Sequence, residues 1–295
     1  MHNAAFAALG LNWRYLAFAV HPDHLRAAIT GARAMQFAGL NLTVPHKLLA
    51  LDMVDALDES ARTFGAVNTI RFEGRDAKGE WLPLRCFGVS AVAGRTPEGG
   101  TPNAEHAEAP NEIRTQGFNT DAEGLVNSLR GDLKVEPRGA KILLLGAGGA
   151  GRTAALKLAG EGAAELFLVN RTQIKAEEIA AEIQKRHPGV RTTAGYPKTD
   201  VDLLLNATSL GLKPGDASPL DEKQFSPRRA RAVYDMIYNP AETALLKSAK
   251  AAGCRSANGL GMLLRQGAKA FEIWTGQPAP LDVMHRALEK NIYGH

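Results

Sequence analysis

Three glycines with a defined spacing, Gly146, Gly148 and Gly151, lie in the stretch KILLLGAGGAGR at residues 141 to 152. The apolar run before them predicts a strand buried on both faces, and the apolar residues after them have helical spacing. In a G-x-G-x-x-G turn the first glycine makes the tight turn, the second lets a pyrophosphate approach the backbone, and the third lets helix and strand pack closely. The helix N-terminus adds N–H groups and the positive end of its dipole. The predicted pyrophosphate-binding residues are therefore Gly146, Ala147, Gly148, Gly149, Ala150 and Gly151.

The next predicted strand, residues 165 to 169, arrives where a β-α-β unit needs it and is followed by Asn170, Arg171 and Thr172. An NAD site usually has Asp or Glu here to bind the ribose 2′-hydroxyl, whereas Arg accommodates a 2′-phosphate. Arg171 and Lys175 supply cations, and their polar neighbours supply neutral hydrogen-bonding groups, so the sequence favours NADP. The alternative is that both cations are ordinary solvated charges at a helix start.

The composition describes a globular chain that is long enough for two domains. Its 295 residues are 45% hydrophobic, which suffices for substantial cores. No apolar run reaches the ~18 residues of a membrane span, and no secretory signal pattern opens the sequence. Cys86 and Cys254 are far apart and in no metal-like spacing, so neither a disulfide framework nor a metal site is expected. We therefore expect a cytoplasmic protein without a membrane partner.

The distribution of charged residues indicates which kinds of binding partner to expect. The net charge is +4 and the isoelectric point is near 9.1, but Lys and Arg are interspersed with Asp and Glu and form no stripe with aromatic residues between them. Nucleic acid is therefore not expected as a partner. A small positive excess suits an enzyme with anionic small-molecule ligands. The oligomeric state stays open, with a homodimer as the alternative to a monomer.

Helical and strand patterns alternate along the chain. Before the glycine turn the sequence predicts helices at 4–9, 24–34 and 48–61, and strands at 15–20 and 39–44. After it the predicted elements are strands at 201–205 and 232–237, and helices at 177–185, 244–252, 260–274 and 283–290. This alternation predicts an α/β fold with two domains and a cleft between them. Residues 121–263 form the expected Rossmann-type nucleotide domain, and residues 1–120 with 264–295 form the other.

Seven short motifs follow one another along the chain. They are Asn-Leu-Thr-Val-Pro-His-Lys at 41–47, Gly-Ala-Val-Asn-Thr at 65–69, Gly-Phe-Asn-Thr-Asp at 117–121, Gly-Ala-Gly-Gly-Ala-Gly-Arg at 146–152, Asn-Arg-Thr at 170–172, Asn-Ala-Thr-Ser-Leu-Gly at 206–211 and Gly-Met-Leu-Leu-Arg-Gln-Gly at 261–267. Their order and rough spacing resemble shikimate dehydrogenase nearly from end to end. The resemblance implies NADP-dependent, reversible reduction of 3-dehydroshikimate to shikimate, a step of chorismate and aromatic amino acid biosynthesis, with shikimate held by the non-nucleotide domain.

The resemblance assigns the acid and base chemistry to Lys47 and Asp121. Reduction of a ketone by a nicotinamide needs a hydride and a proton for the developing alkoxide. A lysine tuned by burial and a neighbouring carboxylate can donate that proton and can take it back in the reverse direction. Without the resemblance, Lys47 would be taken for a surface charge. For the adjacent His46 a structural role is expected.

The same resemblance implies which residues hold shikimate and the nicotinamide. Carboxylate and amide groups suit the substrate hydroxyls, each of which both donates and accepts a hydrogen bond. The expected substrate-binding residues are Thr43, Asn68, Asp121, Tyr238 and Gln266. At the nicotinamide end of the cofactor the expected residues are Asn206, Thr208, Gly259 and Met262. The alternatives are a turn residue for Asn68, an exposed helix position for Gln266 and a packed aromatic for Tyr238.

The chain departs from the family pattern in two places. Between Thr69 and Gly117 the family usually has a short hairpin, whereas this chain has a longer insertion. Residues 70–72 and 81–89 are expected to form the hairpin, and the polar, Gly- and Pro-rich stretch near 90–115 is expected to be a mobile loop. In the family an opening strand and a serine-containing loop precede the Met-His-Asn motif found at residues 1–3. A chain that lacks them is expected to bind shikimate weakly and to keep NADP binding.

Other hypotheses stay beside the NADP-dependent enzyme. One is an NAD-dependent quinate/shikimate dehydrogenase, against which the Asn-Arg-Thr motif argues. Another is a catalytically impaired NADP-binding relic. Glutamyl-tRNA reductase has a similar nucleotide domain, but the motifs around Lys47, Asn68 and Asp121 favour shikimate dehydrogenase.

Overall fold

The computed structural model describes residues 1–84, 110, 112–213 and 215–294, and it divides into two compact units. The nucleotide unit comprises Met1, Asp121–Gly267 and the stretch from Leu281 onward, and the N-terminal unit comprises His2–Thr120 and Ala268–Pro280. Both units mix helices and strands, so the predicted two-domain α/β class is confirmed. The units differ from the predicted domains at the C-terminus, where helix α10 (Leu281–Tyr293) groups with the nucleotide unit.

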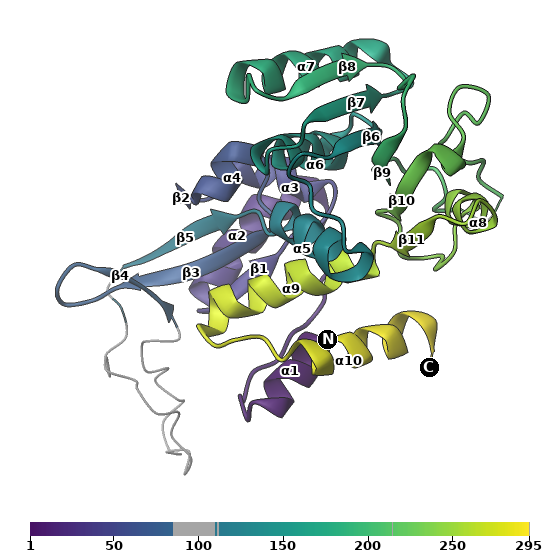
Figure 1. Ribbon diagram of the computed structural model, residues 1–295. Helices are drawn as coiled ribbons and strands as arrows, with labels where there is room; N and C mark the ends of the chain where they lie inside the picture. The colour runs from purple at the N-terminus through teal and green to yellow at the C-terminus, as the bar shows by residue number, and fades with distance from the viewer. Residues whose placement is uncertain (85–109, 111, 214, 295) are drawn as a thin grey trace. The chain divides into compact units, whose positions relative to one another are not determined.

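A six-stranded parallel sheet forms the centre of the nucleotide unit (Figure 1). Its order is β11-β10-β9-β6-β7-β8, and every neighbouring pair is parallel. The strands are β6 (Lys141–Leu145), β7 (Glu165–Val169), β8 (Arg191–Ala194), β9 (Val201–Asn206), β10 (Ala230–Asp235) and β11 (Arg255–Asn258). From β6 the sheet continues through β7 on one side and through β9 on the other. Ligands of open α/β sheets bind outside the carboxyl ends of the strands at such a switch point.

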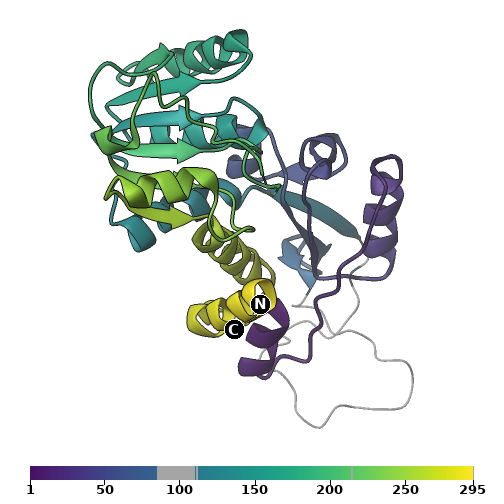
Figure 2. The same ribbon diagram turned by 90° about the vertical axis from the view of Figure 1, so that its right-hand side faces the viewer.

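Both faces of β6 are buried, as its apolar run predicts. Leu143 and Leu145 belong to a core with Leu245 and Leu246 of α8 (Ala244–Ala251), and each is at most 3% exposed. Successive side chains of a strand alternate, so Ile142 faces the other side. Burial of one such Leu or Ile contributes about 1.5–3 kcal/mol. Three further helices of this unit, α5 (Asp121–Leu133), α6 (Gly149–Gly160) and α7 (Gln173–Arg186), are seen with the sheet in Figures 1 and 2.

The N-terminal unit is built on a smaller mixed sheet. Strands β1 (Gly39–Asn41), β4 (Trp81–Pro83) and β5 (Ile113–Phe118) pair antiparallel with β3 (Thr69–Arg75), and β2 (Ala56–Leu57) pairs parallel with β5. Helix α2 (Leu25–Ala34) buries Leu25 and Ile29 in one core with Ile70 and Phe72 of β3. Helix α9 (Leu260–Thr275) begins in the nucleotide unit and ends in this one, where Trp274 donates a hydrogen bond to the Ile70 carbonyl.

Several predicted elements are confirmed in the N-terminal unit. Helix α1 (His2–Ala8) is followed by Gly10 at φ +67°, and α2 lies where the 24–34 helix was predicted. The predicted hairpin is present as β3 and β4, with Gly79 at φ +84° in its turn. Residues 85–109, which include most of the predicted mobile loop, lie outside the described residues. The end of that predicted loop is wrong, because β5 already begins at Ile113 and pairs with β3.

The strand predicted at residues 15–20 is wrong. No strand is assigned to residues 11–21, and Leu16 and Phe18 are each 64% exposed. The backbone of Tyr15 is bound by the side chain of Asn3, which accepts from its N–H at 2.7 Å and donates to its carbonyl at 2.9 Å. An apolar, β-prone sequence forms a strand only when a neighbouring strand pairs with it. Residues 15–20 pair with no strand in the described chain, and the nearby β1 pairs with β3 instead.

The single helix predicted at residues 48–61 is also wrong. The chain forms α3 (His46–Leu49), a 3₁₀ turn at Ala50–Asp52, β2 and then α4 (Glu59–Phe64). Asp58 begins α4 by accepting a hydrogen bond from Ser60 N at 2.8 Å. An Asp in the middle of an apolar helical pattern is thus a helix start rather than a helical residue.

Two kinds of feature are absent from the described ranges. None of the helices there combines the length and apolar character that crossing a membrane requires. The same residues contain no group of three or more His, Cys, Asp or Glu side chains that could hold a metal ion.

Candidate active site

The glycine turn has the geometry that a dinucleotide requires. Gly146 has φ +105°, a value that favours glycine, and Gly148 is the extended N-cap of α6. A Cβ added at Gly148 or Gly149 would meet nothing within 4 Å, whereas one at Gly151 would lie 2.1 Å from the Gly146 carbonyl oxygen. The first N–H groups of a helix have no intrahelical acceptor. The turn therefore leaves open space in front of free donors, which fits a pyrophosphate.

Asn170 connects the glycine turn to the end of β7. Its Oδ1 accepts a hydrogen bond from Ala147 N at 3.1 Å, and its Nδ2 donates to the Thr172 carbonyl at 2.8 Å. These bonds occupy the side chain with backbone groups of both loops. Asn170 thus shapes the surface on which the predicted cofactor residues Ala147 and Thr172 lie.

Arg171 and Lys175 are exposed at the start of α7. Within the described ranges neither side chain forms an ion pair, and the first turn of α7 contains no acidic residue. Cations are unfavourable at a helix N-terminus, where the dipole is positive. The two charges and the dipole together make a place for an anion.

The loop after β9 packs on the glycine turn. Ala207 N donates to the Leu145 carbonyl at 2.8 Å, and the methyl group of Thr208 lies 3.0 Å from the position of a Cβ on Gly146. This packing places the predicted nicotinamide-side residue Thr208 beside the first glycine. Asn206 is 0% exposed, so it acts here through other protein groups.

Helices α5 and α9 approach each other closely near Asp121, the first residue of α5. A Cβ added at Gly124, one turn later, would lie 3.0 Å from Gln266 Cβ and 3.1 Å from the Met262 carbonyl oxygen. Residues three apart share a helix face, so Asp121 projects from the face of α5 that meets α9. The structure thus places the predicted residues Met262 and Gln266 against the face of α5 on which Asp121 lies.

The N-terminal unit brings together two more predicted residues. Lys47 is half-buried in α3, and its carbonyl accepts a hydrogen bond from Val67 N at 2.8 Å. Asn68, which follows Val67, is 1% exposed. Its Nδ2 donates to Thr120 Oγ1 at 2.9 Å, and its Oδ1 accepts from Thr120 N at 2.9 Å. Thr43 is exposed. Asn68 therefore holds Thr120, the residue before Asp121.

Gly259 and His46 have backbone surroundings that define their roles. A Cβ on Gly259 would lie 2.0 Å from the Met236 carbonyl oxygen, so only glycine fits there. His46 lies with Nε2 3.0 Å from the Val20 carbonyl oxygen, which agrees with a structural role.

Tyr293 on α10 is a residue that sequence reasoning missed. Its hydroxyl donates to the Tyr238 carbonyl at 2.7 Å and accepts from Asn258 Nδ2 at 3.0 Å. It therefore ties the segment of Tyr238, which is 37% exposed, to the residue before Gly259. Burial raises the pKa of Tyr293, so the hydroxyl stays protonated at neutral pH. A tyrosine near the end of the last helix gives no signal of this in the sequence.

If Tyr238 contacts the substrate as predicted, Tyr293→Phe should raise the KM for that substrate by about 2–10-fold, the effect of one ordinary hydrogen bond. The ring is kept, so the melting temperature should change little. Steady-state kinetics measure the first quantity and thermal unfolding the second. Tyr196→Phe is the matched control, because that hydroxyl accepts from Asp221 N away from Tyr238. An unchanged KM in Tyr293→Phe would contradict the expectation that Tyr293 positions Tyr238 for substrate binding.

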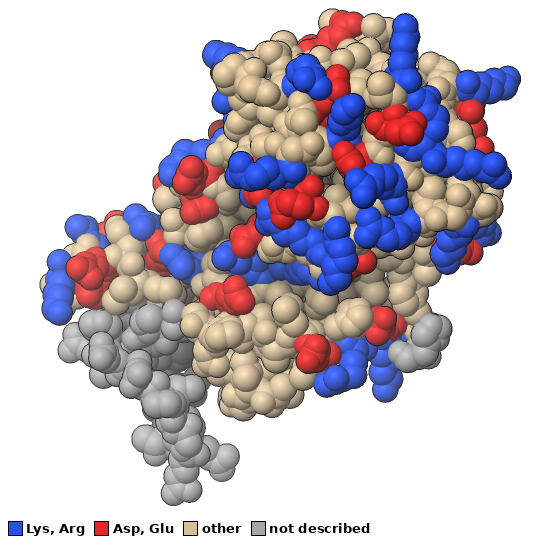
Figure 3. All heavy atoms as spheres, viewed as in Figure 1, with Lys and Arg blue, Asp and Glu red and all other residues tan. Residues whose placement is uncertain are grey.

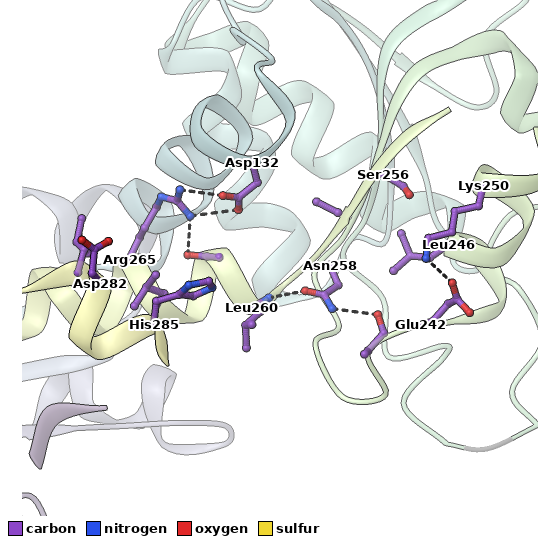
Figure 4. Close-up of a pocket in the computed structure, with 15 residues that line it drawn as sticks. Asp132, Glu242, Leu246, Lys250, Ser256, Asn258, Leu260, Arg265, Asp282 and His285 are labelled. Carbon is purple, nitrogen blue, oxygen red and sulfur yellow. Dashed lines mark hydrogen bonds and ion pairs between the residues drawn. The ribbon is translucent and has the colours of Figure 1, made fainter. Parts of the chain in front are cut away.

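A cavity of about 530 Å³ lies beside β11, between α8, α9 and α10 (Figure 4). Four of its charged side chains form two ion pairs. Arg265 binds Asp132 with contacts of 2.8 and 3.1 Å, and Lys250 binds Glu242. No predicted site residue lines this cavity, so we do not identify it with the active site.

Three family models match separate parts of the chain. Residues 1–70 match the shikimate dehydrogenase substrate binding domain, residues 131–209 match shikimate / quinate 5-dehydrogenase, and residues 259–289 match the shikimate 5'-dehydrogenase C-terminal domain.

Individual relatives agree with these matches. The chain is 38% identical over 300 residues to the shikimate dehydrogenase (NADP(+)) of Methanopyrus kandleri, and the match covers 99% of this chain and 90% of that one. A crystal structure of shikimate dehydrogenase in complex with NADP+ is similar with a TM-score of 0.76 and 33% identity, covering 99% and 89%. The 5-ketofructose reductase of Gluconobacter sp. strain CHM43 is similar with a TM-score of 0.75 and 34% identity, covering 98% and 92%. The chain belongs to the shikimate dehydrogenase family.

Proposed function

We propose that this protein catalyses the NADP-dependent, reversible reduction of 3-dehydroshikimate to shikimate in aromatic amino acid biosynthesis. The observation that carries the proposal is the similarity to a shikimate dehydrogenase (NADP(+)) over 99% of the chain. The open glycine turn and the basic start of α7 support it from the structure. When bound there, NADP supplies or accepts the hydride at its nicotinamide.

Lys47 and Asp121 are the proposed acid and base pair. In the reducing direction the Lys47 ammonium gives a proton to the alkoxide oxygen, and in the oxidising direction the amine takes it back. The Asp121 carboxylate accepts a hydrogen bond from a substrate hydroxyl. Asn68, Gln266, Tyr238 and Thr43 complete the proposed substrate contacts.

A single assay tests this function. The 295-residue chain is incubated with shikimate and NADP, and NADPH formation is measured, with NAD and quinate in parallel reactions. NADPH formation that depends on shikimate supports the proposal. Its absence from folded, NADP-binding protein would contradict it and would leave the relic hypothesis.

The second candidate is reduction of a different polyhydroxylated ketone. It is favoured by the likeness to 5-ketofructose reductase, which matches 98% of the chain at 34% identity. The same glycine turn and the same acid and base pair would serve such a ketone. Turnover of 5-ketofructose with NADPH, compared with 3-dehydroshikimate at equal concentration, separates the two functions.

We expect Arg171→Ala to raise the KM for NADP about tenfold to a hundredfold and to change the KM for NAD little. Loss of one charge-assisted hydrogen bond to the 2′-phosphate accounts for roughly 1.5–3 kcal/mol. Kinetics with both cofactors measure the ratio. Arg186→Ala, at the other end of α7, is the control for a general loss of charge. Equal use of NAD and NADP by the unmutated protein would contradict the cofactor assignment.

The proposed location is the cytoplasm, where soluble biosynthetic substrates and NADP are available. Nucleic acid is not a proposed partner, because Lys and Arg are mixed with Asp and Glu on the face seen in Figure 3. A homodimer is a proposed alternative to the monomer, and light scattering at several concentrations distinguishes them.

A further inference from the structure

Asp235, the last residue of β10, is a carboxylate without an ion-pair partner in the described chain and is 0% exposed. Its Oδ1 accepts hydrogen bonds from Asn206 Nδ2 at 2.9 Å and from Ile237 N at 3.1 Å. Its Oδ2 accepts from the Thr243 hydroxyl at 2.6 Å. The carboxylate is therefore held by three donors, one at the end of β9 and two in the segment that follows β10.

The first donor, Asn206, has its full set of hydrogen bonds inside the protein. Its Nδ2 donates to Asp235 and, at 3.4 Å, to the Leu210 carbonyl. Its Oδ1 accepts from Thr208 N at 2.9 Å and from Thr208 Oγ1 at 2.8 Å. An amide offers two donors and two acceptors, so no site remains for a ligand. Through these hydrogen bonds Asn206 connects Asp235 to the loop at 206–211.

The other two donors connect Asp235 to the segment at 236–243. Ile237 N binds the carboxylate, and Ile237 O accepts from Gly259 N at 3.0 Å. Thr243 is the N-cap of α8, and its Oγ1 also accepts from Leu246 N. The segment between these two residues contains Tyr238. One side chain thus fixes both ends of the loop that carries Tyr238.

We propose that Asp235 is a positioning residue for hydride transfer, which sets the loops of Thr208, Tyr238 and Gly259 in register at the carboxyl ends of β9, β10 and β11. The proposal rests on the proposed function, because it deepens the roles given to these loops. Thr208 lies against the glycine turn, so a shift of its loop displaces the nicotinamide side and spares the 2′-phosphate side at Arg171.

Stability alone does not account for a carboxylate at this place. Burial raises the pKa of Asp235, while the bonds from Thr243, Ile237 and Asn206 lower it. A buried charge is costly unless every oxygen is satisfied, and an apolar residue of similar size is often as stable. An acceptor with two oxygens and defined directions can hold the two segments that donate to it in one arrangement.

Two variants of Asp235 separate positioning from bulk stability. Asp235→Asn keeps the oxygen that binds Asn206 and Ile237, and the Thr243 hydroxyl can turn to accept from the new amide. Asp235→Ala leaves all three donors without their acceptor. Asp202→Ala is the matched control, because this carboxylate lies on β9 near its amino end and binds Lys141 N and Arg231.

We expect Asp235→Ala to lower kcat about 10–100-fold, since small misplacements of reacting groups cost that much. NADPH should bind within about threefold of the unmutated affinity, and the deuterium isotope effect with 4-deuterated NADPH should rise because hydride transfer becomes slower. Asp235→Asn should regain kcat to within about threefold. Thr243→Val, which removes one bond, should fall between them and replaces Asp235→Ala if that variant does not fold.

Three outcomes would overturn the proposal. The first is an Asp235→Ala enzyme with unchanged kcat, and the second is an Asp235→Asn enzyme as slow as Asp235→Ala. The third is a loss of kcat in the Asp235 variants that is proportional to their loss of melting temperature, as in Asp202→Ala, while the isotope effect stays unchanged. Fluorescence of the bound NADPH nicotinamide is recorded without substrate. It should differ from the unmutated enzyme in Asp235→Ala, and less in Thr243→Val, but not in Asp235→Asn or Asp202→Ala. That signal tests the positioning even if the unmutated protein does not turn over shikimate.

Discussion

Replacement of Lys47 by alanine should lower kcat for shikimate oxidation by about 10²–10⁴-fold and leave the KM for shikimate closer to its normal value. The reason is the proposed proton transfer, which affects the transition state more than the bound ground state. Lys47 lies half-buried in the short helix α3, whose backbone is bound to Val67 beside the buried Asn68. The measurement is steady-state kinetics over a range of pH, with circular dichroism to show that the variant is folded.

Lys78→Ala is the control for the loss of a positive charge from the same unit. Lys78 is exposed in the turn between β3 and β4, and its removal should leave kcat unchanged. If folded Lys47→Ala turns over as fast as Lys78→Ala, Lys47 is a surface charge and the acid and base assignment is wrong. A variant with a raised KM and a normal kcat would instead make Lys47 a substrate-binding residue.

Most elements of the nucleotide unit could be predicted from the sequence, although helix α5 was not. Short apolar runs such as residues 142–145, bounded by glycine or polar residues, gave β6, β7, β9 and β10 close to their observed bounds. Parallel strands buried on both faces consist of continuous apolar residues, so the local signal is strong. The edge strands β8 and β11 were missed because their residues are polar or small, and only pairing with β7 and β10 makes them strands.

The N-terminal unit was predicted less well for the same physical reason. Residues 15–20 have high β-propensity but no strand partner, and the 48–61 pattern is broken by a cap at Asp58 and by pairing of β2 with β5. β-propensity reports how a side chain fits a sheet that already exists. The long-range pairing that decides such segments is not visible in a single sequence.

The candidate site shows a similar division. The glycines of the turn and the exposed cations Arg171 and Lys175 could be proposed as cofactor residues from residue type alone. Their predicted role requires only open space at the glycines and no ion-pair partner at the cations. Asn68, Asn170 and Asn206 are predicted to bind ligands, and in the structure their amides also bind protein groups at residues 120, 147 and 235. A polar residue at the end of a strand can serve a ligand or a loop, and only the location of its partners distinguishes the two. Asp235 was overlooked for that reason.

Two alanine substitutions in the glycine turn should have opposite signatures. In Gly151→Ala the new Cβ would lie 2.1 Å from the Gly146 carbonyl oxygen, so the helix and the turn must move apart. We expect destabilisation of about 3 kcal/mol or more, the upper end for overpacking, and NADP binding should weaken because the turn itself shifts. In Gly148→Ala the Cβ meets no protein atom within 4 Å, and φ −80° is allowed to alanine. The melting temperature should therefore stay unchanged, and the loss should appear in the dissociation constant of NADP, by about tenfold to a hundredfold.

Thermal unfolding without ligand and titration with NADP measure the two quantities separately. Gly189→Ala, in an exposed loop with open space around its Cα, is the control and should change neither. A Gly148→Ala protein that binds NADP normally would mean that the pyrophosphate does not approach this backbone. A Gly151→Ala protein with normal stability would mean that α6 can move away from the turn at little cost. The contrast between these positions, one closed by backbone and one open, gives the glycine pattern its physical meaning, because only the closed position is required by the fold and only the open one by the ligand.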